Sequence, residues 1–361
     1  MSIILIQEDK ILRVIEAILD PRVPLERLAA LADFNSSAVD DFPEWLTETR
    51  RELLGLYPSE IRFIKTQEEL LEHLPFADVL ITESLGVGAV ELSKAKKLRV
   101  IQQFGIQTAH LDLKACAQAG VEVKRLRRRT NISMAEHTMM LCLNLARRFP
   151  YVNQLVSVED SIRHGIAYKP YDTRFTPNAN YMRVKDLKTL YGASLCLLGF
   201  GEIAQEVAKM AKVFGMNILC HKSKPLTKSE EALFGVQCVS LNELLAQADF
   251  LSIHVPLTEH TRGLLGSDQL MRMPKGSFLI NTARATVVDH DALVHALQSD
   301  HLAGAAFDVH YTEPVQEAEV LRKLPNFLAT PHVGGASRMN VLMDIKDMLH
   351  NCKPQNPGQL H

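Results

Sequence analysis

One short segment constrains the fold of this chain more than any other. Residues 195–203 (LCLLGFGEI) predict an apolar strand that runs into Gly199-Phe200-Gly201, and residues 204–214 then predict a helix. In that arrangement the first glycine permits a tight turn, and the second lets the backbone approach a pyrophosphate at the N-terminus of the helix that Glu202 opens. Ala204 stands where a third glycine usually packs helix against strand, and a methyl group is tolerated there. A glycine pattern alone also fits an ordinary strand-turn-helix, so the flanking sequence has to decide.

The end of the next strand indicates which dinucleotide is bound. This strand is predicted at residues 216–221, and an acidic residue that binds the adenosine ribose usually follows such a strand. Here Lys222, Ser223 and Lys224 follow, and no carboxylate occurs between positions 217 and 228. An acid would accept hydrogen bonds from a ribose 2′-hydroxyl and repel a 2′-phosphate, whereas these three residues would attract one. The pattern favours NADP over NAD, although lysines that merely face solvent would give the same letters.

Composition excludes several classes of protein. The chain has 361 residues, 47% of them hydrophobic and 23% charged, which is enough for about two globular cores. The formal net charge of −2 provides no electrostatic attraction to nucleic acid or membrane, and no apolar run approaches the roughly 20 residues that span a bilayer. Residues 1–6 lack a preceding basic segment and predict a strand instead of a signal peptide, while the six cysteines form no CxxC pair. We therefore expect a cytoplasmic protein without a metal, nucleic-acid or membrane partner.

Strand-like and helix-like segments alternate along the chain. A first α/β unit is predicted from strands at 61–65, 79–82 and 99–104 with helices around 67–74 and 90–95. Residues 133–149 predict a long amphipathic helix that bridges two domains, with Ser133 and Glu136 as its capping box. After an irregular segment at 168–185, strands recur at 250–254, 277–281, 303–308 and 326–330. Repeated strand-helix units indicate parallel sheets, so we predict an α/β protein with two unequal domains, one of them interrupted by the other.

Three polar residues follow consecutive strands of the second unit. Arg284 follows the strand FLINTA, Glu313 lies five residues past Asp308 at the end of GAAFDV, and His332 follows FLATP. Ligands of parallel sheets bind beyond the carboxyl ends of the strands, so we expect these side chains to converge on one cleft.

An arginine, a carboxylate and a histidine together suit the reduction of a 2-keto acid by a nicotinamide. The guanidinium can form paired hydrogen bonds with the carboxylate and carbonyl oxygen of the substrate. The histidine can protonate the alkoxide as hydride arrives at carbon, and a carboxylate beside its ring stabilises the imidazolium. Each residue alone also fits a structural salt bridge or cap, and the grouping of the three favours catalysis.

Several segments together resemble the signature motifs of the D-isomer specific 2-hydroxyacid dehydrogenases, a family with glyoxylate/hydroxypyruvate reductase-like and phosphoglycerate dehydrogenase-like members. They are NTARATVVD, GAAFDVHYTEP, TPHVGGAS, HVPLTEHTRGLL, LDLKACAQAGVEV and ISMAEHT, and the resemblance spans roughly residues 77–340. It implies that Arg284 orients the substrate, His332 is the acid/base, Glu313 is its partner, and Asp308 lies beside the nicotinamide. It also implies two Rossmann-like, doubly wound domains, usually in a homodimer. The discontinuous substrate domain would comprise residues 1–132 and 334–361, and the inserted NAD(P)-binding domain residues 133–333.

The glycine loop and the resemblance together assign binding residues. Those expected to contact NADP or NAD are Gly199, Gly201, Glu202, Ile203, Lys222, Ser223, Lys224, His254, Val255, Pro256, Thr261, Thr282, Ala283, Arg284, Asp308, His332, Gly334 and Gly335. Those expected to contact the 2-keto or 2-hydroxy acid substrate are Leu85, Gly86, Gly105, Ile106 and Arg284.

Departures from the family pattern bear on the substrate. Where the family has a G-x-G pair for the substrate carboxylate, Gly105-Ile106-Gln107 keeps only the first glycine, and Gln107 would narrow the pocket. Glu83 stands where phosphoglycerate-type members carry an arginine, and it would repel a phosphorylated substrate. The loop Leu85-Gly86-Val87 is expected to offer backbone donors.

Other interpretations stay open. The basic run at 125–129 (RLRRR) is either a solvated face or a cationic rim for a larger acidic substrate or a regulatory anion, and His137 is expected to be a packed structural histidine. The chain also resembles the C-terminal binding protein corepressors, in which the dinucleotide regulates partner binding. That interpretation predicts a Pro/Ser-rich tail, whereas the sequence ends ten residues beyond Asn351. Related family members act on formate or phosphite with similar motifs, so the identity of the 2-hydroxy acid stays open.

Overall fold

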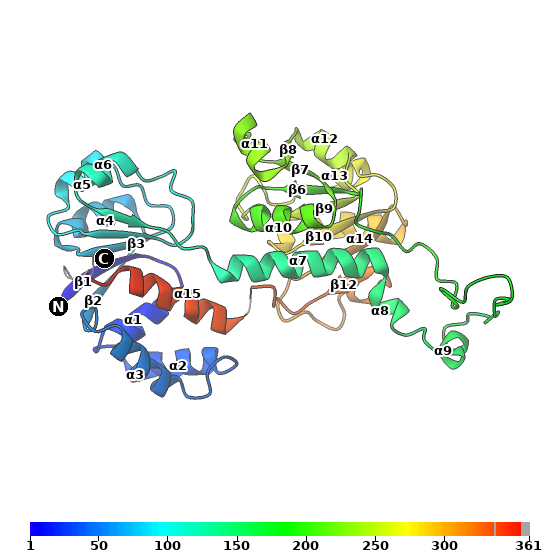
Figure 1. Ribbon diagram of the computed structural model, residues 1–361, viewed down its shortest axis with the longest axis horizontal. Helices are drawn as coiled ribbons and strands as arrows, with labels where there is room; N and C mark the ends of the chain where they lie inside the picture. The colour runs from blue at the N-terminus through cyan, green and yellow to red at the C-terminus, as the bar shows by residue number, and fades with distance from the viewer. Residues whose placement is uncertain (336, 355–361) are drawn as a thin grey trace. The chain divides into compact units, whose positions relative to one another are not determined.

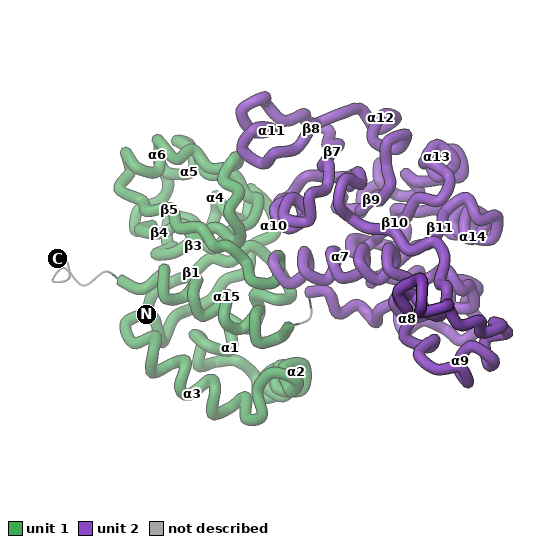
Figure 2. The backbone as a smooth tube through the Cα atoms, turned by 45° about the vertical axis from the view of Figure 1, so that its right-hand side comes forward, with its two compact units in different colours: residues 1–131, 336–361 green, residues 132–335 purple. Residues whose placement is uncertain are grey.

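The computed structural model describes residues 1–335 and 337–354 and contains two compact units. Unit 1 comprises Met1–Asn131 with the C-terminal part of the chain from residue 336, and unit 2 comprises Ile132–Gly335 (Figure 2). The predicted boundaries lay at 132/133 and 333/334. Each unit contains one parallel sheet, so the prediction of an α/β protein with two Rossmann-like units is confirmed.

Unit 1 is a five-stranded sheet with helices on both faces (Figure 1). Its order is β2-β1-β3-β4-β5, with β1 Ser2–Gln7, β2 Ser59–Ile64, β3 Val79–Thr82, β4 Val100–Gln103 and β5 Glu122–Lys124. Ile4 and Ile6 of β1 pack with α1 (Arg13–Leu19), α3 (Phe42–Glu52) and α15 (Arg338–Asn351), and α2 (Leu25–Asn35) borders this layer. Leu5, on the opposite face, packs with α4 (Gln67–His73), the turn η1 (Leu74–Phe76), α5 (Ala89–Lys94) and α6 (Leu113–Gln118). A strand buried on both faces needs an uninterrupted apolar run, as residues 3–6 provide.

Unit 2 is a seven-stranded parallel sheet in the order β12-β11-β10-β9-β6-β7-β8. Its strands are β6 Ser194–Leu198, β7 Asn217–His221, β8 Gln237–Cys238, β9 Phe250–Ile253, β10 Ser277–Asn281, β11 Leu302–Phe307 and β12 Phe327–Ala329. Its helices are α7 Arg129–Arg147, which starts in unit 1, α8 Phe149–Val152, α9 Val158–Arg163, α10 Glu202–Val213, α11 Lys228–Phe234, α12 Leu241–Ala246, α13 Ser267–Arg272 and α14 His290–Gln298, with short turns η2 Ala285–Val287 and η3 Leu321–Lys323. The order reverses at β6, which places the predicted glycine loop at a switch point of the sheet, where ligands bind.

Helix α7 begins four residues before the predicted capping box, so Ser133 lies inside the helix and that prediction is wrong. The cap comes from α15 instead, because Oδ1 of Asp344 accepts the backbone N–H of Arg129 at 3.1 Å. The same carboxylate lies 3.1 Å from Nη1 of Arg129, and Asp347 pairs with that atom at 2.6 Å. Arg129 of the basic run therefore has a structural role in unit 1.

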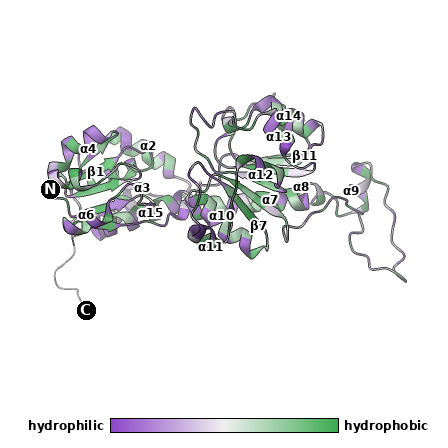
Figure 3. Cartoon of the chain, turned by 90° about the horizontal axis from the view of Figure 1, so that it is seen from above, coloured by the Kyte–Doolittle hydropathy of each residue, from purple (hydrophilic) through white to green (hydrophobic). Residues whose placement is uncertain are grey.

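An extended arm joins α8 to β6 in unit 2. Apart from α9 it contains no helix or strand in this described stretch, as the irregular composition of residues 168–185 predicts, and it projects away from the sheet of its own unit (Figures 1 and 3). Apolar side chains on it face solvent, including Ile162 and Phe175, which are 68% and 82% exposed. None of the helices in the described part of the chain is long and apolar enough to cross a membrane.

Candidate active site

The glycine loop between β6 and α10 has the backbone that a bound pyrophosphate needs. Gly199 has φ 94°, and a Cβ there would lie 2.6 Å from the carbonyl oxygen of His254, so only glycine fits. Gly201 is the N-cap of α10, and a Cβ built on it meets no atom within 4 Å. Ala204 is fully buried between helix and sheet. The loop thus pairs a glycine required by the fold with one that leaves open space at a helix N-terminus, where phosphate groups bind.

The segment after β7, where the adenosine ribose is expected, lies near a carboxylate that the sequence analysis did not include. Lys222 is half-buried after β7, whereas Ser223 and Lys224 are exposed. Glu230 of α11 lies close enough to interact electrostatically with both lysines. Hydrogen bonds from Thr227 hold the pKa of the Glu230 carboxyl below its usual value, and the charges of Lys222 and Lys224 lower it further. Glu230 lies just beyond positions 217–228, in which the sequence contains no carboxylate. Its negative charge offsets part of the positive charge of Lys222 and Lys224.

The predicted cofactor residues gather at one edge of the sheet. Strand β9 pairs with β6 in parallel, so His254-Val255-Pro256 follow β9 beside the glycine loop. Burial lowers the pKa of His254 to about 4, so its imidazole is neutral at pH 7. Thr261 donates from its hydroxyl to the carbonyl of Pro256 at 2.6 Å. The remaining candidates follow the carboxyl ends of β10, β11 and β12. The candidates thus lie at the carboxyl ends of several neighbouring strands, where an extended dinucleotide can bind.

Arg284 lies just after β10 on a turn that a buried side chain shapes. Nδ2 of Asn281 donates to the carbonyl oxygen of Arg284 at 3.0 Å, and the N–H of Ala283 donates to Oδ1 of Asn281 at 3.0 Å. The Arg284 side chain is exposed, and its Nη1 donates to the carbonyl of Ala283 at 2.6 Å. Asn281 was not recognised from the sequence, because an asparagine that ends a strand has no distinguishing local pattern.

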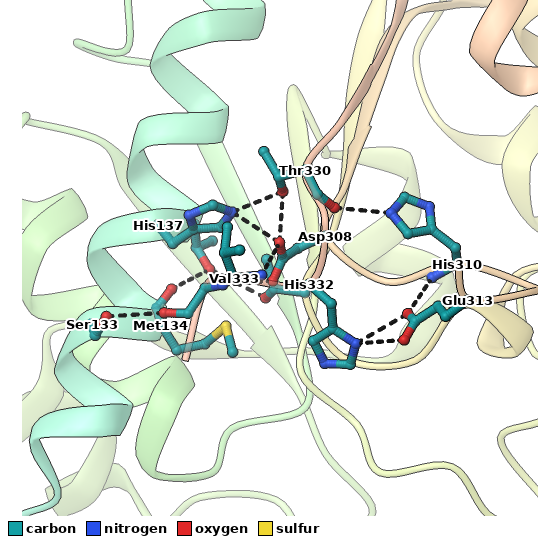
Figure 4. A network of polar contacts seen from close by, with 12 residues as sticks. Ser133, Met134, His137, Asp308, His310, Glu313, Thr330, His332 and Val333 are labelled. Atoms are coloured by element: carbon teal, nitrogen blue, oxygen red, sulfur yellow. Dashed lines mark hydrogen bonds and ion pairs between the residues drawn. The ribbon is translucent and has the colours of Figure 1, made fainter. Parts of the chain in front are cut away.

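Glu313 and His332, predicted to converge, form a pair. Nδ1 of His332 lies 2.9 Å from Oε2 and 3.0 Å from Oε1 of Glu313, with the two side chains 45% and 40% exposed (Figure 4). Burial raises the pKa of the Glu313 carboxyl, but hydrogen bonds from His332 and from the backbone N–H of His310 outweigh it, so the pKa lies below its usual value. An ionised carboxylate only accepts, so Nδ1 carries a proton and Nε2 remains for other chemistry. Arg284 makes no hydrogen bond or ion pair with either residue in the described structure.

Asp308 holds the turn that presents His332. His332 has φ 56°, a left-handed conformation that costs a non-glycine residue roughly 1–2 kcal/mol. Asp308 accepts the backbone N–H groups of Val333 and Gly334 at 2.9 and 2.8 Å and the hydroxyl of Thr330 at 2.6 Å (Figure 4). Burial of this carboxyl raises its pKa, but its hydrogen bonds lower the pKa to about 2. The buried carboxylate is therefore ionised at neutral pH.

Glu313 is tied to the same turn through His310. The backbone N–H of His310 donates to Oε1 of Glu313 at 3.0 Å, while its Nε2 donates to the carbonyl oxygen of Thr330 at 2.9 Å. Both members of the Glu313–His332 pair are thus anchored on Thr330. Neither His310 nor Thr330 was recognised from the sequence, because their roles depend on contacts across about twenty residues.

In unit 1, the expectation of free backbone donors after β3 is wrong. Oε1 of Gln7 accepts the N–H groups of Glu83, Ser84 and Leu85 at 2.8, 2.8 and 3.2 Å. The N–H of Gly86 donates to Gln67 at 3.2 Å, and that of Val87 donates to the carbonyl oxygen of His110 at 3.1 Å. The side chains of Gln7 in β1 and Gln67 in α4 and the backbone carbonyl of His110 therefore satisfy this loop, an arrangement that no local sequence pattern reveals.

Glu83, which the sequence suggested would repel phosphate, has a cationic neighbour. Nη1 of Arg128 lies 3.7 Å from Oε1 of Glu83, and the guanidinium carbon lies 3.9 Å from the ring centre of Phe104. Arg128 is part of the basic run, which is therefore not a uniformly solvated face: Arg128 and Arg129 both have partners within unit 1.

Comparison with known proteins gives one consistent family. Residues 139–334 match the family described as D-isomer specific 2-hydroxyacid dehydrogenase, NAD binding domain. The chain is 36% identical over 274 residues to D-3-phosphoglycerate dehydrogenase of Methanocaldococcus jannaschii. The aligned residues cover 75% of this chain and 48% of that protein. It is 32% identical to a formate dehydrogenase of Arabidopsis thaliana (78% and 71% covered) and 32% identical to glyoxylate reductase of Korarchaeum cryptofilum (75% and 77%). The match thus spans about half the length of the phosphoglycerate dehydrogenase and over two thirds of the other two.

Solved structures share the fold. The TT0316 protein of Thermus thermophilus is 28% identical with a TM-score of 0.50, covering 98% of this chain and 96% of that one. NAD-dependent formate dehydrogenase of Staphylococcus aureus, solved in complex with NAD, is 24% identical with a TM-score of 0.51, covering 99% and 98%. At this identity the second likeness concerns the fold alone.

Proposed function

Because the chain belongs to the D-isomer specific 2-hydroxyacid dehydrogenase family, we propose that it interconverts a D-2-hydroxy acid and its 2-keto acid with NAD(P). The Glu313–His332 pair carries this proposal, since it lies at the carboxyl edge of the same sheet whose β6–α10 loop fits a pyrophosphate. An acid/base pair on a dinucleotide-binding sheet suits hydride transfer coupled to proton transfer.

The chemistry divides between the bound dinucleotide and this chain. NAD(P)H supplies the hydride that reaches the carbonyl carbon. Arg284 orients the substrate by hydrogen bonds to its carboxylate and carbonyl oxygen. His332 transfers its Nε2 proton to the carbonyl oxygen, which becomes the hydroxyl, and Glu313 stabilises the imidazolium before transfer. The half-exposed imidazole then regains a proton from water, and oxidation follows the same steps in reverse.

NADP is the proposed preferred cofactor, with NAD as the alternative. Lys222, Ser223 and Lys224 supply the cationic and polar groups that a 2′-phosphate requires. Glu230 weakens this preference without replacing the missing ribose-binding acid, because its carboxylate accepts hydrogen bonds from the backbone N–H and hydroxyl of Thr227 and is held at the start of α11.

The substrate is proposed to be a small 2-keto acid. Arg284 would bind its carboxyl group. The backbone N–H groups of Leu85 and Gly86 would not bind substrate, because they already donate hydrogen bonds to Gln7, Thr82 and Gln67. This favours a substrate without a phosphate, since unit 1 offers no free backbone donors at residues 83–87 in the described structure.

We propose that the chain forms a homodimer. A groove on unit 2 is lined mainly by apolar side chains, those of Met139, Met140, Leu143, Phe149, Met210 and Phe214, together with Glu136, Asn144 and Arg147. The arm of the same unit leaves Val156, Ile162 and Phe175 in water at 62%, 68% and 82% exposure. One chain thus carries both a groove and exposed apolar side chains, which a second copy can cover reciprocally. Light scattering after gel filtration tests this, and a monomer at micromolar concentration would contradict it.

The function is tested by absorbance at 340 nm with NADH and NADPH against glyoxylate, hydroxypyruvate, pyruvate and bulkier 2-keto acids. We expect dinucleotide oxidation with at least one of them. Formate with NAD⁺ and NADP⁺ is the matched test of the alternative seen in the Arabidopsis relative. Turnover of formate without any 2-keto acid reduction would replace the proposed activity.

A further inference from the structure

Helix α7 contacts the turn that carries His332 through His137. Nε2 of His137 lies 3.0 Å from Oγ1 of Thr330 and 3.4 Å from Oδ1 of Asp308, and its side chain is 12% exposed (Figure 4). Thr330 and Asp308 are the two residues on which the turn and its Glu313 partner are anchored. His137 is therefore connected to His332 by an unbroken set of hydrogen bonds.

The hydrogen bonds of Thr330 show that Nε2 of His137 carries a proton. Thr330 has one hydroxyl proton, and its bond of 2.6 Å donates that proton to Asp308. The hydroxyl oxygen can then only accept from His137, so Nε2 of His137 carries a proton. An apolar side chain in its place would leave Thr330 and the buried Asp308 without this donor.

The far end of the turn also packs against α7. Ser133, one helical turn before His137, donates from Oγ to the carbonyl oxygen of Gly334 at 3.0 Å. A Cβ on Gly334 would lie 2.8 Å from Sδ of Met134 and 3.1 Å from Cδ2 of His137. Since backbone and helix are already in contact there, a change at His137 is transmitted to the turn instead of being absorbed by empty space.

We propose that His137 is a positioning residue for His332 and acts through Thr330 and Asp308. It helps to keep the backbone of His332 in its left-handed conformation and its imidazole paired with Glu313. The inference rests on the proposed acid/base role of His332. It gives His137 no contact with substrate, so its loss should impair proton transfer more than substrate binding.

The primary test compares His137→Leu, which removes the donor, with His137→Gln, whose amide N–H reaches a similar point. His137→Leu should lower kcat about tenfold or more with KM for the keto acid changed less than about threefold, because misplacing an acid/base group by an ångström slows chemistry. His137→Gln should recover most of kcat. His295→Leu, the same change at an exposed histidine of α14, is the control and should match wild type.

A double-mutant cycle separates positioning from general destabilisation. In a His332→Ala background, His137→Leu should cause no further loss, since the group that it positions is absent. Equal losses in both backgrounds would overturn the proposal. If His137→Leu does not fold, Thr330→Val and Thr330→Ser provide the same comparison, with the serine hydroxyl expected to retain activity.

Hydrogen exchange gives a readout without catalysis. In His137→Leu the segment 330–335 should exchange faster than in His295→Leu or wild type, because the amides of Val333 and Gly334 depend on Asp308. If wild type is active and His137→Leu keeps both the wild-type kcat and the wild-type exchange rates, the positioning role of His137 is contradicted and the proposed function is not. If wild type reduces no 2-keto acid, the proposed function is contradicted. In that case, unchanged exchange in His137→Leu would also contradict the coupling between His137 and the turn.

Discussion

Oε2 of Glu313 lies 2.9 Å from Nδ1 of His332, although the two residues are nineteen positions apart and both side chains are partly exposed. Exposure weakens the attraction between the charges, so the pair depends on being held in place. The backbone N–H of His310 holds the carboxylate, and Asp308 holds the turn that carries the histidine.

The first prediction concerns pH. In Glu313→Gln the neutral amide no longer stabilises the imidazolium that donates the proton, so turnover in keto acid reduction should fall. The dependence of the reduction rate on pH should also differ from that of wild type. Initial rates between pH 5 and 9 measure this, and superimposable profiles would show that Glu313 does not assist His332.

The second prediction uses two glycines of one loop as a matched pair. Gly199→Ala should destabilise unit 2 by at least about 1–2 kcal/mol, because its φ is 94° and a Cβ would lie 2.6 Å from a carbonyl oxygen. Gly201→Ala should unfold like wild type but bind NAD(P)H about tenfold or more weakly, since its methyl group would enter space left for the phosphates. Thermal unfolding and fluorescence titration of both variants test this. Unchanged affinity in Gly201→Ala would show that the loop does not bind the dinucleotide.

Local patterns predicted the sheet well and the polar network poorly. Strands at 79–82 and 277–281 were predicted with their observed limits, because apolar runs between turns are local signals. The start of α7 was missed because its cap, Asp344, lies 215 residues from Arg129. Free donors were expected after β3 because the partners of these groups, Gln7 and Gln67, come from other elements. Long-range partners of this kind leave no local sequence pattern.

The third prediction concerns acid stability. The pKa of Asp308 is about 2 in the folded chain and 3.8 ordinarily, so its ionisation stabilises the fold above pH 4 and this contribution is lost as the pH falls to 2. A difference of this size is worth about 2 kcal/mol. Asp308→Asn should therefore be less stable than wild type at pH 7, with a smaller difference at pH 3. Urea unfolding measures this, with Asp291→Asn, at an aspartate 98% exposed, as the control. A difference that does not change with pH would contradict the low pKa.

The fourth prediction tests the cofactor. Wild type should bind NADPH more tightly than NADH, and Lys222→Asp should reverse the order by more than about tenfold, or 1.4 kcal/mol, because it supplies a ribose acceptor and repels the 2′-phosphate. Glu230→Gln should strengthen NADPH binding, since it removes a negative charge near both lysines. Titration of both nucleotides decides, and a wild type that prefers NADH would show that Lys222 and Lys224 only face solvent.

The central claim is that His332 supplies the proton during reduction of a 2-keto acid. The most direct measurement is single-turnover oxidation of enzyme-bound NAD(P)H, followed at 340 nm after mixing wild type or His332→Ala with the best keto acid. We expect the variant to bind dinucleotide normally and to turn over about 10²- to 10⁴-fold more slowly, which is the usual contribution of a general acid. Equal rates in the two proteins would contradict the account.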